Sequence, residues 1–512
     1  MSSAPADAER IAPELAAGEP TRAGVSAQHA AGSKPLDHAA ARTIVAGIML
    51  AMFLSALEQT IVAPALPAIG KSLGGIDDLS WVVTAYLLAA TATTPLFGKL
   101  SDIYGRRAVL LSAIGIFVAG SIACAVAPSI WLLIVGRAVQ GIGGGGLLPI
   151  AQTIIADMLS PRERPVVQGY TSVMFMSASI LGPVLGGLMT DHLHWSLIFW
   201  INLPLGAVAL IMTDRALRRL PRHDRPHQLD VIGAVLLVGA ALSLMLALAW
   251  GGSHYAWTST RIVILLAASA ALWVLFPLRL LTAREPFIPL SILHGRVTAM
   301  ITCAAFFSIG TIIGITIYTP LYCQTVLGVS ASLSGFALIG FMGGATIGSL
   351  ITARLMVRVR RYTLVAMVGQ LVAVVVLTVL AVDPAGPSLK EVGALLFALG
   401  CGLGPMYPMS TIVMQNVVKP HQMGTATGTL NFFRLLGGAI IVAAFGAIVL
   451  GGSKSGVGTL EQLAASHRDM APAFHFVFIA AAFFIAISIL CLTAVEAQPL
   501  HGPVRVSEPR SE

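Results

Sequence analysis

Charged residues are scarce in this sequence: Asp, Glu, Lys and Arg make up only 11% of its 512 residues, while 56% are hydrophobic. Soluble globular proteins carry about 25% charged residues, because polar groups must cover their surfaces. So few charges, together with a mean hydropathy of +0.85, exclude an ordinary soluble domain. The composition indicates an integral membrane protein.

Catalytic and metal-binding motifs are also missing. The five cysteines lie singly in apolar segments without CxxC spacing, so neither a disulfide framework nor a metal site is expected. GxSxG and Walker sequences are absent, which excludes the common signatures of serine hydrolases and ATP-driven pumps. "GIGGGG" (141–146) matches GxGxxG, but it lies within an apolar helix, without the strand that a dinucleotide site requires. We expect no enzyme activity, no cofactor and no metal.

Long apolar runs are what the sequence has instead. Runs of about 20 residues recur along nearly the whole length, and each is long enough to cross about 30 Å of hydrocarbon as a helix. The alternating strands of a membrane barrel are not evident. We predict an all-α integral membrane protein with fourteen spans, at residues 43–67, 80–98, 108–127, 130–155, 169–190, 196–213, 231–250, 261–281, 297–322, 330–352, 363–382, 391–414, 425–450 and 472–494.

The basic residues predict the orientation. The net charge of +8 resides in short loops between spans, where it reports topology rather than a nucleic-acid-binding face. Most of these Lys and Arg residues fall on the side that also holds both termini, so the positive-inside rule makes both tails cytoplasmic. Residues 1–42 are rich in Ala, Gly, Pro and charge, and we predict a disordered tail there; residues 495–512 form the second tail.

Two pairs of related segments indicate an internal repeat. "GKLSDIYGRRAVLL" (98–111) has its counterpart in "ARLMVRVRRYTLV" (353–365), and "LGPVLGG" (181–187) in "RLLGGAI" (434–440). Each pair is separated by the same number of spans. We predict two six-helix halves, 43–213 and 282–494, with a basic loop and two inserted helices at 214–281. Parallel halves of this kind place a substrate cavity at their interface near the midplane.

Glu58 is the only acidic residue well inside a predicted span, within "LSALEQTIVAPALPAIG" (54–70). A charge at this depth costs roughly 2.5–3.5 kcal/mol on insertion scales, so such acids usually face a water-filled cavity and act there. Glu58 is therefore a candidate proton carrier. The alternative is a neutral Glu that makes an interhelical hydrogen bond.

Arg137 and Arg434 are the only basic residues well inside predicted spans. Arg137 is our first choice for a partner whose approach to Glu58 ties a conformational change to a proton, and Arg434 is a possible site in the second half. Either could instead bind the carbonyls of a Gly-rich helix. In the loop after the second span, Asp102 could meet a helix N-terminus while Arg106 and Arg107 meet an acid on a neighbouring helix.

Together these segments resemble the fourteen-span drug:proton antiporters of the major facilitator superfamily, the EmrB/QacA-like group. "LEQTIVAPALP" (57–67) is similar to the group's first-span signature, and "GKLSDIYGRR" to the loop motif of the whole superfamily. "RAVQGIGGG" (137–145) resembles the fourth-span motif, and "LGPVLGG" the fifth-span motif of antiporters. "WINLPLG" (200–206) and "REPFIPLSIL" (284–293) are further marks of the group.

The resemblance implies roles for the matching residues. Glu58 and Arg137 would couple protons to transport, and Asp102, Arg106 and Arg107 would form a cytoplasmic gate. A pliable helix that seals or opens the cavity would contain Gly182, Pro183, Gly186 and Gly187. The sequence departs from the group where Glu58 replaces the usual Asp, and Val357 stands where the second loop would carry an acid, so the gate is expected on one side only.

We therefore expect a proton-coupled antiporter that exports amphipathic small molecules, such as drugs, dyes and toxic metabolites, across a bacterial inner membrane by alternating access. One buried acid would favour neutral or cationic substrates. Its partners would be the substrate, protons and the bilayer; some members of the group work with a periplasmic adaptor, on which no residue here reports. One alternative is a major facilitator carrier, either an exporter or an importer, for one metabolite such as a vitamin or siderophore. Another is a sensor that does not transport, but the two tails are too short to supply the signalling module that a sensor needs.

Overall fold

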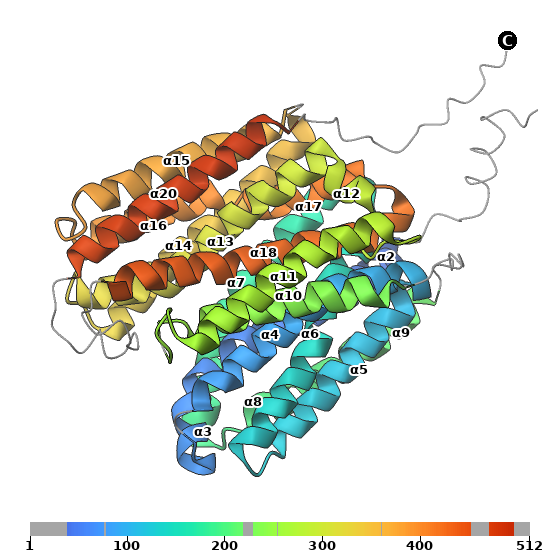
Figure 1. Ribbon diagram of the computed structural model, residues 1–512, viewed down its shortest axis with the longest axis horizontal. Coiled ribbons are helices and arrows are strands. Elements are labelled where there is room, and N and C mark those ends of the chain that lie inside the picture. Colours follow the sequence, from blue (N-terminus) through green and yellow to red (C-terminus); the bar gives the residue numbers. More distant parts are fainter. Residues whose placement is uncertain are drawn as a thin grey trace, which may run out of the picture.

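The computed structural model describes residues 38–75, 78–218, 229–252, 254–359, 361–451 and 470–495. The predicted tails fall almost entirely outside these residues. Within them, fourteen helical segments are long and apolar enough to cross a membrane, and they correspond one to one with the predicted spans. Figure 1 shows them as long, roughly aligned helices.

The first six spans begin with α2 (His38–Ile61), which continues through the short helix η1 (Ala63–Ala65) into α3 (Leu66–Leu73). The α-helical hydrogen bonding is interrupted there because Pro64 and Pro67 cannot donate backbone hydrogen bonds, and each lies at the start of the next helical segment. The other five are α4 (Leu79–Tyr104), α5 (Arg106–Ala125), α6 (Ile130–Met158), α7 (Arg164–His192), and α8 (Leu197–Trp200) with α9 (Asn202–Leu217).

The last six spans repeat this plan. They are α13 (Arg296–Thr325), α14 (Ala331–Arg358), α15 (Thr363–Val382), α16 (Leu389–Leu403) with α17 (Met406–Val417), α18 (Met423–Gly451) and α20 (Ala471–Thr493). Ser388 and Glu391 form a capping box at the start of α16, and Ser330 caps α14. These caps fix where two of the spans begin.

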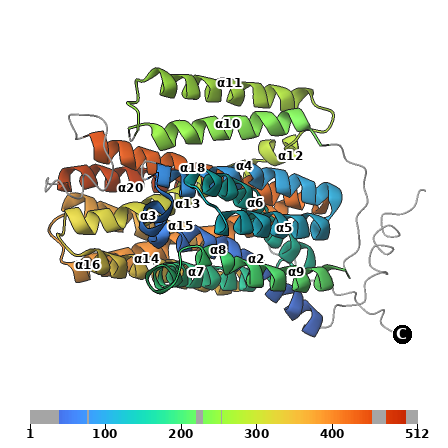
Figure 2. The same cartoon turned by 90° about the horizontal axis from the view of Figure 1, so that it is seen from below.

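Two further spans, α10 (Val231–Trp250) and α11 (Thr260–Thr282), form a helical hairpin on one side of the bundle, as Figure 2 shows. Asp230 caps α10 by accepting a hydrogen bond from Gly233 N, and it also pairs with Arg279 of α11 at 3.0 Å. The hairpin contacts α4 and α18, and the short helix α12 (Leu290–His294) leads from it into α13.

The main contacts between the two sets of six spans form two matching pairs. The second span, α4, packs against the thirteenth, α18, while the tenth, α14, packs against the fifth, α7. These four helices carry the two pairs of repeated sequence segments, so each half contributes equivalent helices to the interface. This exchange is the arrangement expected from two related halves.

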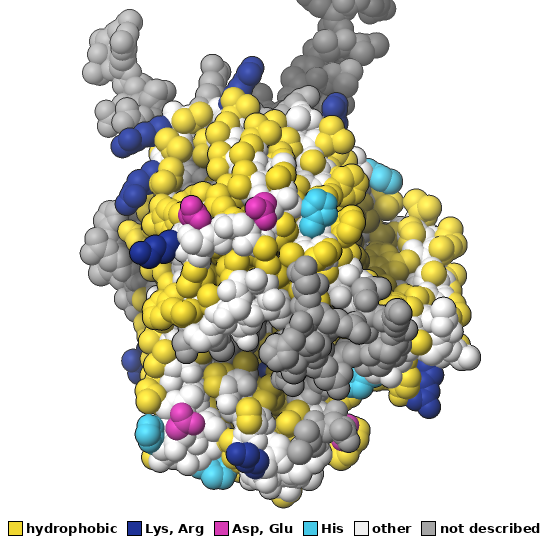
Figure 3. All heavy atoms as spheres, turned by 90° about the vertical axis from the view of Figure 1, so that its left-hand side faces the viewer, with side chains coloured by type: hydrophobic (Ala, Val, Ile, Leu, Met, Phe, Trp, Pro, Cys, Tyr) yellow, Lys and Arg dark blue, Asp and Glu magenta, His cyan; other side chains and the backbone are white. Residues whose placement is uncertain are grey.

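Several helices extend beyond the predicted spans, most clearly α4, which continues to Tyr104, and α14, which continues to Arg358. Hydropathy identifies only the apolar part, whereas the backbone remains helical through the polar ends. The outer surface of the bundle is largely hydrophobic. Figure 3 shows the left-hand end of the molecule in Figure 1, where hydrophobic side chains predominate and charged ones are scattered.

Candidate functional site

Glu58 lies near the middle of the first span and is fully buried. Its two carboxylate oxygens have different partners: Arg137 Nη1 donates a hydrogen bond to Oε1 and forms an ion pair with it, and Asn202 Nδ2 donates to Oε2 at 2.6 Å. The structure thus brings together the acid and the arginine that were singled out from the sequence, 79 residues apart. Buried charges are tolerated when paired and hydrogen-bonded in this way.

The pair belongs to a closed ring of five side chains, which we call the Glu58 ring: Glu58, Arg137, Gln140, Ser121 and Asn202. Arg137 Nη1 also donates to Gln140 Oε1 at 2.7 Å, Gln140 Nε2 donates to Ser121 Oγ at 2.7 Å, and Asn202 Nδ2 donates to the same Oγ at 3.2 Å. All five are buried and come from α2, α5, α6 and α9. A change at Glu58 therefore reaches four helices of the first half.

Arg137 makes contacts of both kinds considered from the sequence, with the carboxylate and with a backbone carbonyl. Besides its bond to Glu58, its Nε donates to the carbonyl oxygen of Val82 on α4 at 2.8 Å. Its guanidinium carbon lies 4.4 Å from the centre of the Tyr86 ring and 5.8 Å from that of Phe199. These contacts hold the cation in one position against aromatic faces.

Asn202 and Gln140 are two members of the ring that the sequence does not mark as partners of Glu58. Asn202 is part of the "WINLPLG" segment and begins α9, and Gln140 lies one helical turn after Arg137. The signal that could have identified them is a side-chain amide within an apolar span, because a buried amide requires a hydrogen-bond partner. Their partners became evident only from the packing of α9 against α2 and α5.

A cavity of about 320 Å³ lies between the two halves. Its wall combines Ser55, Gln59 and Tyr86 from the first half with Phe341, Tyr407 and Arg434 from the second. Glu58 and Arg137 are absent from the wall, although acids at this depth were expected to face a cavity. Tyr86 lies between the two features, since it lines the cavity and its ring stacks on Arg137.

Arg434 in α18 is the buried cation of the second half, with 2% of its surface exposed. Its Nη2 donates to the Tyr407 carbonyl at 2.9 Å, to Ser410 Oγ at 2.7 Å and to Thr411 Oγ1 at 2.8 Å, and its Nη1 donates to Asn431 Oδ1 at 3.1 Å. All of these acceptors are neutral. Two of them are carbonyl oxygens, the kind of partner considered from the sequence, and two are hydroxyl oxygens.

The two halves are joined by hydrogen bonds at the end of the bundle where Arg106 and Arg107 lie, which we call the basic end. Asp102 accepts hydrogen bonds from Gly424 N at 3.0 Å and Thr425 N at 2.7 Å, so it caps the first turn of α18 across the boundary. Deeper in the interface, Asn431 Nδ2 donates to Gln152 Oε1 at 2.8 Å. These contacts tie the two halves together at the basic end.

The arginines near Asp102 meet acids on neighbouring helices. Arg106 binds Asp102 and also donates to Asp157 Oδ2 of α6 at 2.9 Å, and Arg107 forms an ion pair with Asp214 of α9. Gly98 permits the close approach of α4 and α18, because a Cβ there would lie 3.1 Å from the Cα of Gly428. The predicted contacts of this loop are therefore present, and a role in gating stays a proposal.

With this geometry in place, comparison with known proteins decides the family. Residues 48–442 match the Major Facilitator Superfamily. The chain belongs to the Major Facilitator Superfamily. A multidrug transporter, MdtP of Bacillus subtilis, is 35% identical over 79% of this chain and 75% of its own length, and multidrug resistance protein 3 of the same organism is 34% identical over 80% of each. The efflux pump dotC of Dothistroma septosporum is 32% identical over 82% of this chain and 73% of its own length.

Solved structures of the superfamily share the fold. The human transporter MFSD10 aligns with a TM-score of 0.60 at 18% identity, over 87% of this chain and 99% of its own length. The proton:xylose symporter XylE aligns with a TM-score of 0.59 at 12% identity, over 90% of this chain and 97% of its own length. The family and the relatives, together with the fourteen candidate spans, make this protein a multi-pass membrane transporter, not an enzyme.

The glycines of the fifth-span segment in this transporter differ in their surroundings. Gly182 packs against Thr60 of α2, and Gly186 against the backbone carbonyl of Ile61, in each case too closely to leave room for a Cβ. A Cβ at Gly187 would meet nothing within 4 Å. Since Thr60 also donates to the Ala178 carbonyl at 3.1 Å, α7 is tightly joined to α2 just after Glu58. Pro183 lies within α7, which remains helical on both sides of it.

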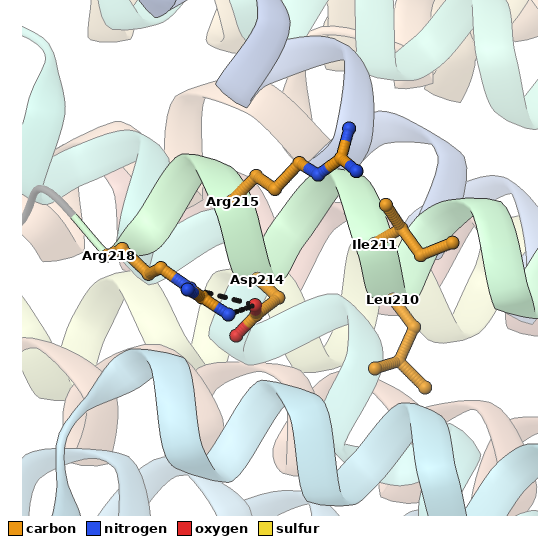
Figure 4. A pocket seen from close by; sticks show the side chains of 5 residues that line it. All are labelled: Leu210, Ile211, Asp214, Arg215 and Arg218. Atoms are coloured by element: carbon orange, nitrogen blue, oxygen red, sulfur yellow. Dashed lines mark hydrogen bonds and ion pairs between the residues drawn. The ribbon is translucent and has the colours of Figure 1, made fainter.

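The transporter also has a surface depression on α9 at the basic end, shown in Figure 4. Its wall contains Leu210, Ile211, Asp214, Arg215 and Arg218, and Figure 4 shows Arg218 bonded to Asp214 while Arg215 points away. This feature is an exposed ion pair rather than a binding site. Among the described residues, no group of three or more His, Cys, Asp or Glu side chains is placed to hold a metal ion.

Proposed function

We propose that this transporter is a proton-coupled antiporter that exports amphipathic small molecules across a bacterial inner membrane by alternating access. The observation that carries this proposal is the buried Glu58 ring directly behind the wall of a cavity shared by both halves. The relatives named for multidrug transport and efflux support the exporting role. Both termini and the basic end would face the cytoplasm.

In this mechanism Glu58 changes between a charged and a neutral form. When charged, it is held by Arg137 and Asn202, and the ring fixes α2 relative to α6 and α9. When a proton neutralises it, the ion pair weakens, and Arg137 is free to adopt another arrangement around Tyr86. The helices that meet in the ring then shift relative to one another, and one of them, α2, also contributes Ser55 and Gln59 to the cavity wall.

The contacts at the basic end would act as the cytoplasmic gate. Asp102, with Arg106 and Arg107, would hold the gate closed while substrate leaves on the opposite side. Opening requires the Asp102 carboxylate to leave the first turn of α18 and the α4 and α18 backbones to separate. The close packing of α7 on α2, at Gly182 and Gly186, would transmit the change at Glu58 to the tenth span, α14, which packs on the other side of the interface.

The test is proton-driven uptake into inverted membrane vesicles of a neutral dye and a lipophilic cation, comparing wild type with Glu58→Gln. We expect the substitution to abolish uptake driven by a pH gradient while the protein remains folded. Glu391→Gln is the matched control, because Glu391 is an exposed acid in a capping box that Gln also satisfies. Normal pumping by Glu58→Gln would place the coupling group elsewhere. A wild type that moves neither dye, and no amphipathic anion either, would favour a carrier for one metabolite.

A further inference from the structure

The charge of the cavity wall comes from Arg434. Among the residues that line the cavity, Arg434 is the one with a charged side chain, and no carboxylate of the described residues forms an ion pair with it. Its four hydrogen-bond acceptors are an amide, two hydroxyls and a backbone carbonyl. Its Nε is buried and has no partner. A buried cation with neutral partners is incompletely compensated, so an added anion would stabilise it.

The buried carboxylate of Glu58 does not offset the charge of Arg434. Glu58 lies outside the cavity wall and is already paired with Arg137, so the pair as a whole is neutral. The sequence alone suggested that one buried acid would favour neutral or cationic substrates. The structure points to the opposite charge, because Arg434 lies in the cavity wall and Glu58 does not.

The rest of the wall fits an apolar body attached to a charged group. Tyr407 covers one face of the guanidinium, with the ring centre 4.4 Å from Cζ, and Phe175 makes an edge contact with Tyr407 at 6.0 Å between ring centres. Phe341, Ile312 and Ile313 add aromatic and aliphatic surface. A volume of about 320 Å³ is at the small end of ligand pockets and holds one compact molecule.

We propose that the cavity binds amphipathic organic anions, compact aromatic or alicyclic molecules with one negatively charged group such as a carboxylate, and that Arg434 is their counter-ion. This inference rests on the proposed function in one respect, namely that the cavity holds the transported substrate. The anionic group accepts a hydrogen bond from the Arg434 guanidinium, whose Nε has no partner in the structure. The apolar body lies against Phe175, Phe341 and the isoleucines.

The experiment compares three ligands of nearly equal shape on the purified full-length protein: naphthylacetic acid, its neutral amide and naphthylethylamine, a cation. Equilibrium binding is measured for wild type, Arg434→Gln and Arg434→Lys. We expect wild type to bind the acid about tenfold to a hundredfold more tightly than the amide, the range for a hydrogen bond to a charged group. Arg434→Gln loses this preference, and Arg434→Lys keeps part of it. Arg215→Gln, an exposed arginine outside the cavity, leaves the preference unchanged.

Equal binding of acid and amide by wild type, tighter binding of the amine, or no binding of any of the three overturns the proposal. So does an Arg434→Gln variant that keeps the preference for the acid. If that variant does not fold, the wild-type ratio and the Arg434→Lys ratio decide. Glu58→Gln separates this proposal from the proposed function: it is expected to retain the preference for the anion even though pH-driven transport stops. Normal pH-driven transport with retained anion preference in this variant would overturn only the proposed function, and lost coupling without any anion preference in wild type would overturn only the present proposal.

Discussion

The side-chain amide of Asn202 donates a hydrogen bond of 2.6 Å to the Glu58 carboxylate, although 144 residues separate the two along the chain. The same amide nitrogen lies 3.2 Å from Ser121 Oγ, so it closes the Glu58 ring. Both Asn202 and Glu58 are fully buried. The carboxylate is therefore held by the sixth span as well as by Arg137.

Asn202→Ala removes the donor to Glu58 Oε2 and opens the ring. We expect the rate of proton-driven efflux to fall about tenfold or more, because a hydrogen bond to a charged group contributes about 1.5–3 kcal/mol. The measurement is substrate flux in vesicles at several external pH values. Asn416→Ala, at a half-buried amide in the last turn of α17, is the control. A full rate in Asn202→Ala would mean that Arg137 alone sets the state of Glu58.

Arg137→Gln leaves a buried carboxylate without its cation. Breaking a buried pair on one side costs about 3–5 kcal/mol, so we expect a large fall in the melting temperature of the purified protein. The double variant Glu58→Gln, Arg137→Gln should be more stable than Arg137→Gln, because no unpaired charge remains. Arg218→Gln, which breaks an ion pair on a 65% exposed side chain, should change stability by less than about 1 kcal/mol. Equal losses in the single and double variants would contradict a charge effect.

Much of this site is visible in the sequence for a physical reason. Glu58 and Arg137 stand out because a charge inside a long apolar run is costly, so its position alone marks it. Asn202 and Gln140 do not stand out in this way, since uncharged polar residues also occur in membrane helices as packing groups. Only the packing of α9 and α6 against α2 shows that both serve the same carboxylate.

The fold followed the same pattern. Fourteen spans could be counted because each one is a run of about 20 apolar residues that the sequence shows directly. The repeated segments indicated two halves. The partner of Asp102 could not be identified, because Gly424 lies 322 residues away and caps depend on three-dimensional contact. The position of Glu58 outside the cavity wall also could not be predicted, since helical rotation about the axis depends on which neighbours pack on each side.

Asp102→Ala removes the cap on α18 at the basic end. Loss of a helix cap costs about 0.5–2 kcal/mol, which corresponds to about a twofold to thirtyfold rise in the population open at that end. The measurement is alkylation of a cysteine introduced at Thr346, in the cavity wall, by an impermeant maleimide added to inverted vesicles. Asp191→Ala, an exposed acid near the end of α7, should leave the alkylation rate unchanged. An unchanged rate in Asp102→Ala as well would rule out a gate at this contact.

Gly98→Ala tests the same closed end through backbone packing. The added methyl group would meet the Gly424 carbonyl and the Cα of Gly428, and neither can move without separating α4 from α18. We expect faster alkylation at position 346 and slower transport. Gly115→Ala in α5 is the matched control, because a Cβ there meets nothing within 4 Å and Ala favours the helix by roughly 0.5–1 kcal/mol. Similar behaviour of the two variants would mean that the approach of α4 to α18 is unimportant.

Gly186 and Gly187 separate close packing from helix flexibility within the fifth-span segment. If this segment acts as a pliable helix, alanine at either position should impair transport, because both lose the conformational freedom of glycine. The structure predicts a difference instead: a Cβ at Gly186 would collide with the Ile61 carbonyl of α2, whereas a Cβ at Gly187 has open space.

Overpacking of this kind typically costs 1–3 kcal/mol. We therefore expect Gly186→Ala to reduce flux about tenfold and Gly187→Ala to retain it, with both rates normalised to the amount of folded protein. Equal impairment in both variants would favour helix flexibility over contact with α2. The packing of Gly186 on Ile61 would then not be the contact that transmits a change at Glu58 to α7.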